Sequence, residues 1–220
     1  MENKLEKMDD FFNKVANTYD THMIDDLGLK EFYDEFQKLL QFSDEKFVFV
    51  DLGCGTGLEI ERIFASCPNA EITGIDLSEA MLQLLKQKFA DKLAQLNIIC
   101  KSYFNFDFGN SKYDYAVSTY SLHHFSPNKK LTLYKQIYDG LKENGIFING
   151  DYIVNSIEKE QFYHSENIRI RAENKIDDGF YHYDTPLYFK TEEELLLKAG
   201  FKSVSVVKQW ENTVIFVCNK

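Results

Sequence analysis

The hydrophobic positions of the chain change their period repeatedly from residue 46 onward. Short runs rich in valine, isoleucine and aromatic residues predict strands over 46–51, 70–76, 97–101, 113–119 and 146–154. Between them, apolar residues recur at the three- and four-residue spacing of a helix that buries one face. Strands that alternate with helices are typical of a parallel sheet covered by helices.

Helix boundaries can be placed between these strands. One helix is predicted over 58–65, directly after a glycine cluster. Ser78 suits the N-cap of the next helix, whose apolar stripe consists of Met81, Leu85 and Phe89. Ser126 followed by Pro127 predicts the start of a third helix, which we expect to end near Gly145.

The regions on either side of this alternation have different patterns. Residues 1–45 are helical and amphipathic, whereas 156–190 is polar and aromatic without a clear strand, so both predict caps outside the sheet. A capping box that begins at Thr191 opens the last helix. Two final strands over 202–208 and 213–217 are predicted to pair as a hairpin.

Composition narrows the class of protein. The chain has 220 residues, of which 44% are hydrophobic and 27% charged, as in an ordinary folded domain. Its first residues mix acids with lysines and lack the apolar run of a secretory signal, and no run approaches the ~18 apolar residues of a membrane span. Four cysteines without CxxC pairing indicate reduced, buried thiols in a cytoplasmic protein: Cys54, Cys67, Cys100 and Cys218.

The formal net charge of −10 disfavours nonspecific binding to nucleic acid or to an anionic membrane. Both partners require a cationic face that can displace counterions. Two arginines come close together in the segment 167–171, where a solvated helix face is the favoured interpretation over a nucleic-acid contact.

The most informative stretch is the heptapeptide DLGCGTG over 51–57, at the point where a strand gives way to a helix. Glycines at this position let the backbone turn sharply, adopt positive φ and touch a ligand directly. A dinucleotide fingerprint would read GxGxxG, whereas here Leu58 follows a GxGxG pattern. This departure points away from a nicotinamide cofactor.

With this heptapeptide in its strand-to-helix context, the stretch 46–154 resembles the class I S-adenosylmethionine (SAM)-dependent methyltransferases. The resemblance implies that Asp51 orders the turn and the amino-acid end of SAM. It also implies that Gly53, Cys54 and Gly55 let the methionine and ribose lie against the backbone.

Asp76 ends the second predicted strand, where an acid that accepts hydrogen bonds from the ribose hydroxyls is expected. Leu77 and Met81 beside it are expected to pack on the adenine. Many relatives carry an acid just after the third strand, but this chain has Ser102 and Tyr103 there, which are our candidates for contacts to the adenine; Asp107, several residues later, is the alternative acceptor.

Two further segments match the family resemblance. The segment 118–125 looks like the one that passes beside the methionine, so main-chain groups of Ser118 and Thr119 are expected to contact SAM. His123 is our candidate general base, although His124 is an alternative and a structural role for the pair remains open. The pattern FxxxAxxYD over 12–20 resembles a helix that covers SAM and places Tyr19 near its methionine.

No metal centre is predicted, because the five histidines show neither HExxH nor another paired ligand spacing. The family resemblance implies SAM as the cofactor, and no second cofactor is expected.

The expected fold is α/β, a Rossmann-like seven-stranded, mostly parallel sheet with helical caps over the site. We expect one methyltransferase domain over 1–220. Its parts are an N-terminal helical cap, a cofactor-binding core, an inserted cap, and a terminal helix with a β-hairpin, over 1–45, 46–155, 156–190 and 191–220 respectively.

The expected function is SAM-dependent transfer of a methyl group to an unidentified small molecule. A module that binds SAM without catalysis is the main alternative, because a fold does not guarantee its activity. An oxidoreductase is disfavoured by Leu58, and methylation of RNA or protein by the acidic charge. The oligomeric state stays open, with a homodimer among the options.

Overall fold

The computed structural model describes residues 5–177 and 179–220. It contains a seven-stranded sheet in the order β3-β2-β1-β4-β5-β7-β6. The strands are β1 Val48–Leu52, β2 Glu71–Asp76, β3 Leu96–Cys100, β4 Tyr113–Thr119, β5 Leu141–Tyr152, β6 Ser203–Gln209 and β7 Thr213–Asn219. The first five pair in parallel, while β7 runs antiparallel to both β5 and β6. This confirms the predicted seven-stranded, mostly parallel sheet.

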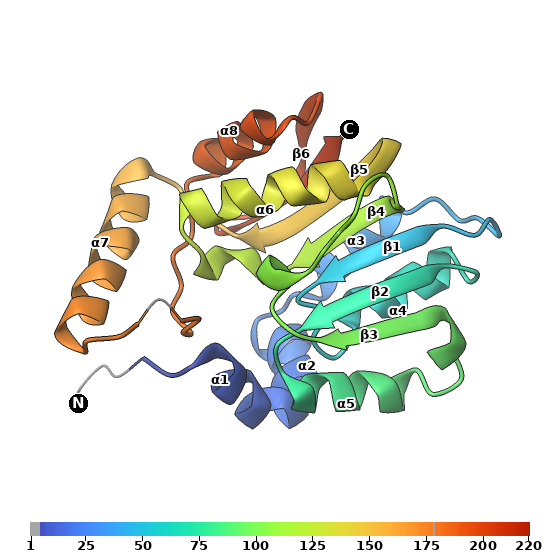
Figure 1. Cartoon of the computed structure of the whole chain (residues 1–220), viewed down its shortest axis with the longest axis horizontal. Helices are drawn as coiled ribbons and strands as arrows, with labels where there is room; N and C mark the ends of the chain where they lie inside the picture. The colour runs from blue at the N-terminus through green and yellow to red at the C-terminus, as the bar shows by residue number, and fades with distance from the viewer. Residues whose placement is uncertain (1–4, 178) are drawn as a thin grey trace.

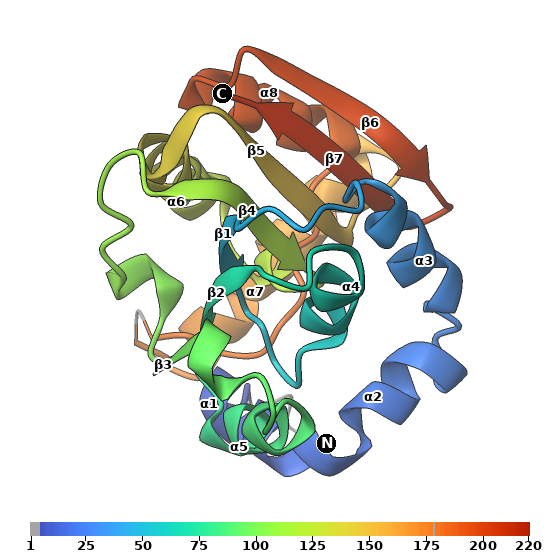
Figure 2. The ribbon, with the colours of Figure 1, turned by 90° about the vertical axis from the view of Figure 1, so that its right-hand side faces the viewer.

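Helices cover both faces of the sheet (Figures 1 and 2). One face carries α3 Lys30–Lys38, α4 Leu58–Ser66 and α5 Glu79–Lys88. The other carries α6 Pro127–Gly140 and α8 Phe189–Ala199. In the part of the chain that the structure describes, three more helices lie outside these layers: α1 Met8–Val15, the short α2 Tyr19–Thr21 and α7 Ile157–Glu173. Between α1 and α3 the chain also forms a 3₁₀ turn over Ala16–Thr18 and a π-turn over His22–Asp26.

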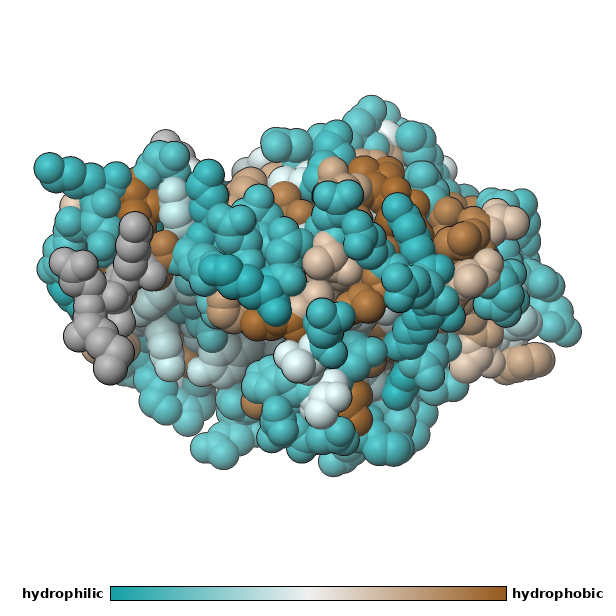
Figure 3. Space-filling model, turned by 90° about the horizontal axis from the view of Figure 1, so that it is seen from below, coloured by the Kyte–Doolittle hydropathy of each residue, from teal (hydrophilic) through white to brown (hydrophobic). Residues whose placement is uncertain are grey.

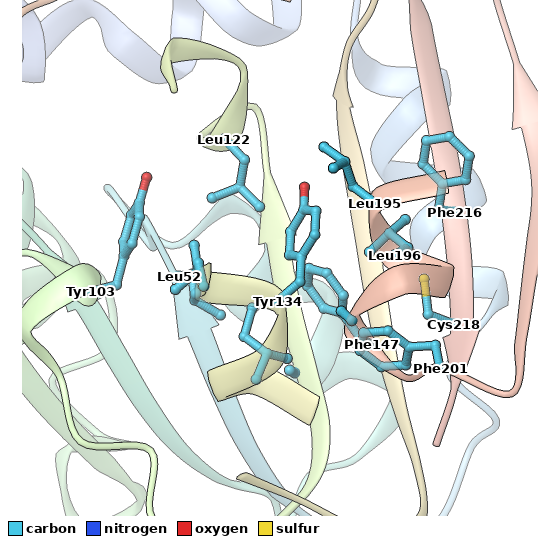
Figure 4. Packing of buried hydrophobic residues seen from close by; sticks show 14 of the residues in the cluster. Leu52, Tyr103, Leu122, Tyr134, Phe147, Leu195, Leu196, Phe201, Phe216 and Cys218 are labelled. Carbon is cyan, nitrogen blue, oxygen red and sulfur yellow. The ribbon is translucent and has the colours of Figure 1, made fainter. Parts of the chain in front are cut away.

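Neighbouring residues of each central strand belong to two separate hydrophobic clusters. Phe49 packs with α3, α4 and α5, while Val50 packs with α6 and α8. Such alternation follows from the two-residue period of a strand. On the α6 side, Tyr134 and Phe147 lie next to each other with ring centroids 5.8 Å apart (Figure 4).

The caps lie at the carboxyl ends of the parallel strands. Figure 1 shows α1 and α7 beyond the tips of the strand arrows, away from the layers that cover the sheet. Hydrophilic residues cover most of the face drawn in Figure 3, and hydrophobic residues show between them in patches. None of the helices in the described part of the chain combines the length and the hydropathy that a membrane-spanning helix needs.

Most predicted element boundaries hold to within two residues, with three exceptions. Helix α6 ends at Gly140 because β5 begins at Leu141 and continues through the expected helix end near Gly145. Helix α8 begins at Phe189, so Thr191 lies inside the helix and is not its cap. The inserted segment contains the 17-residue helix α7, which we did not predict because its sequence is largely polar.

The cysteines agree with the prediction of free thiols. None of the four forms a disulfide among the residues described. Three are buried, but Cys100 is exposed at the end of the outer strand β3, so the expectation of burial was wrong for this residue.

A buried ion pair joins α6 to α8. The Lys130 ammonium lies 2.7 Å from Glu192 Oε2, and the Tyr134 hydroxyl donates to the other carboxylate oxygen. Lys130 and Glu192 are 1% and 2% exposed, so each charge depends on the other for compensation.

Lys130→Ala is expected to lower the free energy of unfolding by about 3 to 5 kcal/mol, because it leaves the Glu192 charge buried without a partner. Urea denaturation followed by circular dichroism measures this change. Lys198→Ala is the matched control, since Lys198 pairs with Glu194 at 3.4 Å on the exposed surface of α8 and should cost little. Equal losses in the two variants would contradict the assignment.

Candidate functional site

The turn between β1 and α4 has the left-handed backbone that its glycines predict. Gly53, Gly55 and Gly57 have φ of +76°, +47° and +84°. The Gly53 amide donates to the Ile75 carbonyl at 2.8 Å, which ties the turn to β2. A Cβ at Gly53 would lie 2.1 Å from Ser121 Oγ, so this position accepts no side chain without movement.

Asp76 fixes the turn from the neighbouring strand. Its Oδ2 accepts the Gly55 amide at 2.9 Å, and its Oδ1 accepts the Ser78 amide at 2.7 Å. Burial raises the pKa of Asp76, and the two amides oppose that rise. Ser78 caps α5 as predicted, since its hydroxyl accepts the Met81 amide at 3.2 Å.

A cavity lies at the carboxyl ends of β1, β2 and β4, beside this turn. Its lining consists of Met8, Phe12, Tyr19, Gly53, Gly55, Asp76, Leu77, Met81, Tyr103, Tyr120, Ser121 and His124. We call it the cofactor pocket. The fold thus brings together eight residues that the sequence singled out, namely Tyr19, Gly53, Gly55, Asp76, Leu77, Met81, Tyr103 and His124.

The other predicted contacts lie behind this lining. The Ser118 hydroxyl donates to the Leu52 carbonyl at 3.0 Å, and the Thr119 hydroxyl donates to Glu59 at 2.9 Å. Ser102 accepts the Phe104 amide at 3.3 Å and so caps a 3₁₀ turn over Tyr103–Asn105. These side chains, together with the buried Cys54 and Asp51, support the wall from within.

Three carboxyl groups gather under the glycine turn without a cation. Asp51 is fully buried, and neither of its oxygens has a hydrogen-bond partner among the described residues. Burial and the neighbouring Glu59 carboxylate raise the pKa of Asp51, while burial also raises the pKa of Glu59. Asp76 adds negative charge to both.

Within the described chain, no lysine or arginine forms an ion pair with any of the three acids. Such a cluster favours a cationic ligand, because a positive charge nearby lowers the cost of ionising buried carboxyl groups. SAM carries positive charge on its sulfur and on its amino group. The acids and the glycine turn therefore fit the cofactor that the sequence predicts.

The N-terminal helix closes the pocket. Asn13 on α1 accepts hydrogen bonds from the Ser78 hydroxyl at 2.8 Å and from the Ala80 amide at 3.1 Å, so α1 is docked on the start of α5. The Tyr19 ring contributes to the lining, and burial together with Glu59 raises its phenol pKa. Tyr19 therefore stays neutral.

The two caps also meet each other. The Met8 amide donates to the Phe180 carbonyl at 3.1 Å, and Phe11 stacks on His182 with centroids 3.6 Å apart. The roof of the pocket is thus continuous between the N-terminal segment and the segment that follows α7.

Of the two adjacent histidines, His124 lines the cofactor pocket and His123 does not. His123 Nδ1 lies 2.6 Å from Asp151 Oδ1, and its Nε2 lies 3.6 Å from Asp184. Both nitrogens of His123 therefore face carboxylates. His124 Nδ1 lies 3.2 Å from Asp184 Oδ1.

These contacts give the histidines opposite protonation tendencies. Burial lowers the pKa of His123, but the Asp151 charge and hydrogen bond raise it to a net value above normal. Burial and the neighbouring His123 charge lower the pKa of His124 to about 4. Burial alone would raise the pKa of Asp184, but its hydrogen bond to His124 and the histidine charges hold it below normal. A neutral His124 beside an ionised Asp184 follows.

The fold also brings ligand-type atoms together that sequence spacing did not connect. One atom each of His123, His124 and Asp184 lies within 4.8 Å of the others. These groups also pair with one another, and His123 pairs with Asp151.

Sequence reasoning missed part of the lining, chiefly Met8, Tyr120 and Ser121. Tyr120 and Ser121 directly follow the residues expected to contact SAM, and Tyr120 has a φ of +47° that reorients the chain at the end of β4. Positive φ is ordinarily expected at glycine, so the sequence did not indicate that the chain turns at Tyr120. Glu59 was also missed, because an acid in the first helical turn is ordinarily attributed to the helix dipole.

Comparison with known proteins connects this chain to the SAM-dependent methyltransferase family. A family model described as a methyltransferase domain matches residues 49–145, which include the glycine turn and Asp76. A carboxy-S-adenosyl-L-methionine synthase of Campylobacter fetus is 30% identical over 182 residues, covering 77% of this chain and 76% of that protein.

Solved structures share the fold. A Nostoc punctiforme protein proposed to be an O-methyltransferase has a TM-score of 0.72 at 21% identity, covering 99% of this chain and 63% of that chain. Human N-acetylserotonin methyltransferase, solved with SAM, has a TM-score of 0.63 at 16% identity, and the coverage is 96% of this chain and 55% of that chain. At such identities the likeness shows the fold alone.

Gly53→Ala is expected to weaken SAM binding by at least about tenfold, because the new Cβ and Ser121 would push into the pocket floor. Isothermal titration calorimetry measures the dissociation constant. Gly28→Ala is the matched control, since Gly28 has a similar φ of +67° but nothing within 4 Å of an added Cβ. Unchanged SAM affinity in Gly53→Ala would contradict the proposed turn geometry.

His124 is expected to remain neutral down to about pH 4, whereas His123 titrates above 6.5. Nuclear magnetic resonance titration of the ring protons measures both values. Because the unfolded chain protonates its histidine near 6.5, His124 should lower stability as pH falls from 6.5 toward 4. An ordinary His124 titration near 6.5 would show that the ring is not held neutral by its surroundings.

Proposed function

This chain belongs to the class I SAM-dependent methyltransferases, and we propose that it transfers the methyl group of SAM to a small molecule from which His124 accepts a proton. The observation that carries the proposal is the position of His124. It is the histidine that lines the cofactor pocket, and its Nδ1 faces the Asp184 carboxylate. Our sequence candidate was His123, which we now propose as a positioning residue.

When bound, SAM supplies a methyl group already activated by its positive sulfur. The chain contributes position and exclusion of water, which provide much of the rate in such a transfer. Aromatic side chains of Phe12, Tyr19 and Tyr103 line the pocket, and aromatic faces attract cations while they exclude water.

The low pKa of His124 keeps its ring unprotonated and free to accept a proton from the acceptor, and the Asp184 carboxylate stabilises the imidazolium that forms. Nδ1–H donates to the Asp184 carboxylate, which leaves Nε2 as the free acceptor. When the acceptor takes the methyl group that SAM would supply, the proton that the acceptor loses would pass to His124 Nε2. His123, held by Asp151 at 2.6 Å, orients Asp184 from behind. We propose that this proton sharing needs no metal.

A small molecule is the favoured acceptor because the caps enclose the pocket. The net charge of −10 argues against nucleic acid and anionic membranes as partners. Free thiols favour a cytoplasmic location. The oligomeric state is left open, with a homodimer among the options.

Synthesis of carboxy-SAM is the second candidate, favoured by the names of the relatives. Among the described residues, the lining of the cofactor pocket itself holds no lysine or arginine, the usual partners of a carboxylate, but Lys129 and Arg171 line the cavity on the other side of His124. The two candidates give different products from SAM. Methyl transfer leaves S-adenosylhomocysteine, whereas carboxylation leaves SAM heavier by one CO₂.

Methyl-labelled SAM incubated with the protein and a small-molecule extract, followed by mass spectrometry, tests the proposal. We expect label in a small molecule together with S-adenosylhomocysteine. Label retained in a heavier SAM would establish the second candidate, and binding without any product would indicate a non-catalytic module.

His124→Gln is expected to lower the rate by about a hundredfold or more without weakening SAM binding, because it removes the proton acceptor. His22→Gln is the control, since His22 is exposed and pairs with Asp26 on the surface. Chelator treatment should leave the wild-type rate unchanged. A rate for His124→Gln equal to that of the control would refute the assigned base.

A further inference from the structure

A second cavity of about 180 Å³ adjoins the cofactor pocket, and His124 borders both. It lies between the start of α6, helix α7 and the segment over 180–185. Its lining includes Lys129, Arg171, His164 and Asn167. We call it the cationic cavity.

Two positive charges line this cavity, and none of the described lining residues is a carboxylate. Neither Lys129 nor Arg171 forms an ion pair within the described residues. Such an arrangement is unexpected in a chain with a net charge of −10, where acids are abundant. Two unpaired cations beside one cavity favour an anionic ligand.

Arg171 is held in place by the backbone. Its guanidinium donates to the Asp177 carbonyl at 2.7 Å and to the Gly179 carbonyl at 3.0 Å, and it lies 5.3 Å from the centre of the Tyr181 ring. Its neighbour Arg169 instead pairs with Glu166 and Glu173 on the solvent side of α7. The solvated face expected from the sequence thus describes Arg169 but not Arg171.

A neutral polar group completes the lining. His164 Nε2 is buried without a hydrogen-bond partner among the described residues, and burial lowers the pKa of the ring. An orphaned buried nitrogen is costly unless a ligand or water satisfies it. The neutral ring can donate one hydrogen bond, and the Asn167 amide beside the cavity can donate another.

We propose that the cationic cavity binds a carboxylate or phosphate group of the methyl acceptor, so that the substrate class is a small anionic molecule. The inference rests on the proposed function, because it assigns the cavity next to His124 to the acceptor. If Lys129 and Arg171 bind the anionic group of the acceptor, the acceptor lies next to His124, which borders the cofactor pocket. His124 can then remove a proton from the acceptor.

Calorimetric titration of inorganic phosphate and of benzoate into the full chain saturated with S-adenosylhomocysteine tests the proposal. We expect one of the two probes to bind, and Lys129→Gln to weaken that binding by about tenfold through loss of one charge-assisted contact. The stronger probe distinguishes a phosphate from a carboxylate acceptor. Lys135→Gln is the matched control, since Lys135 is exposed on the same helix and lies outside the cavity lining.

Three results would overturn the inference. They are absence of binding by both probes, equal binding by Lys129→Gln and Lys135→Gln, and loss of probe binding when S-adenosylhomocysteine is present. The last result would assign the cavity to the carboxylate of the cofactor itself. Binding of S-adenosylhomocysteine is measured in a separate titration. If S-adenosylhomocysteine does not bind, the proposed function is contradicted, but titration of the probes into the unliganded chain still tests the cationic cavity.

Discussion

The cluster of Asp51, Glu59 and Asp76 beneath the glycine turn is the constraint on which the rest of the site depends. Burying three carboxyl groups together without a cation is unfavourable: burial raises the pKa of all three, and the charge of neighbouring acids raises the pKa of Asp51 and Glu59 further. The fold tolerates this cost because hydrogen bonds from backbone amides hold Asp76 and a hydroxyl from Thr119 holds Glu59. We propose that a cationic cofactor relieves this cost on binding.

The surrounding elements follow from that arrangement. Glycines bring the backbone over the acids, and Asn13 docks α1 on the start of α5 so that Tyr19 covers them. On the opposite side, His124 lies between the cofactor pocket and the cationic cavity. Negative charge under the cofactor and positive charge beyond His124 thus separate the places where a cationic donor and an anionic acceptor would bind.

Local sequence signals predicted the parts of the site that depend on neighbours along the chain. The strand, the glycine turn, Asp76 and the Ser78 cap all lie within short motifs whose backbone geometry their residue types determine. Contacts between distant segments had no such signal. Asp184 and Arg171 meet the site from the inserted segment, and their partners are residues on separate elements or backbone carbonyls. His123 and His124 are adjacent in one 3₁₀ turn, so their side chains point in different directions. The spacing of residues in the sequence does not show which of the two faces the cofactor pocket.

Proton release on SAM binding tests the central claim most directly. Calorimetric titrations near neutral pH, in buffers that differ in ionisation enthalpy, count the protons exchanged when SAM binds. If the buried acids are the counter-charge of the cofactor, binding should release protons, because the positive ligand lowers their raised pKa values. Binding with no proton release would show that the acid cluster is not coupled to the cofactor and would contradict the account.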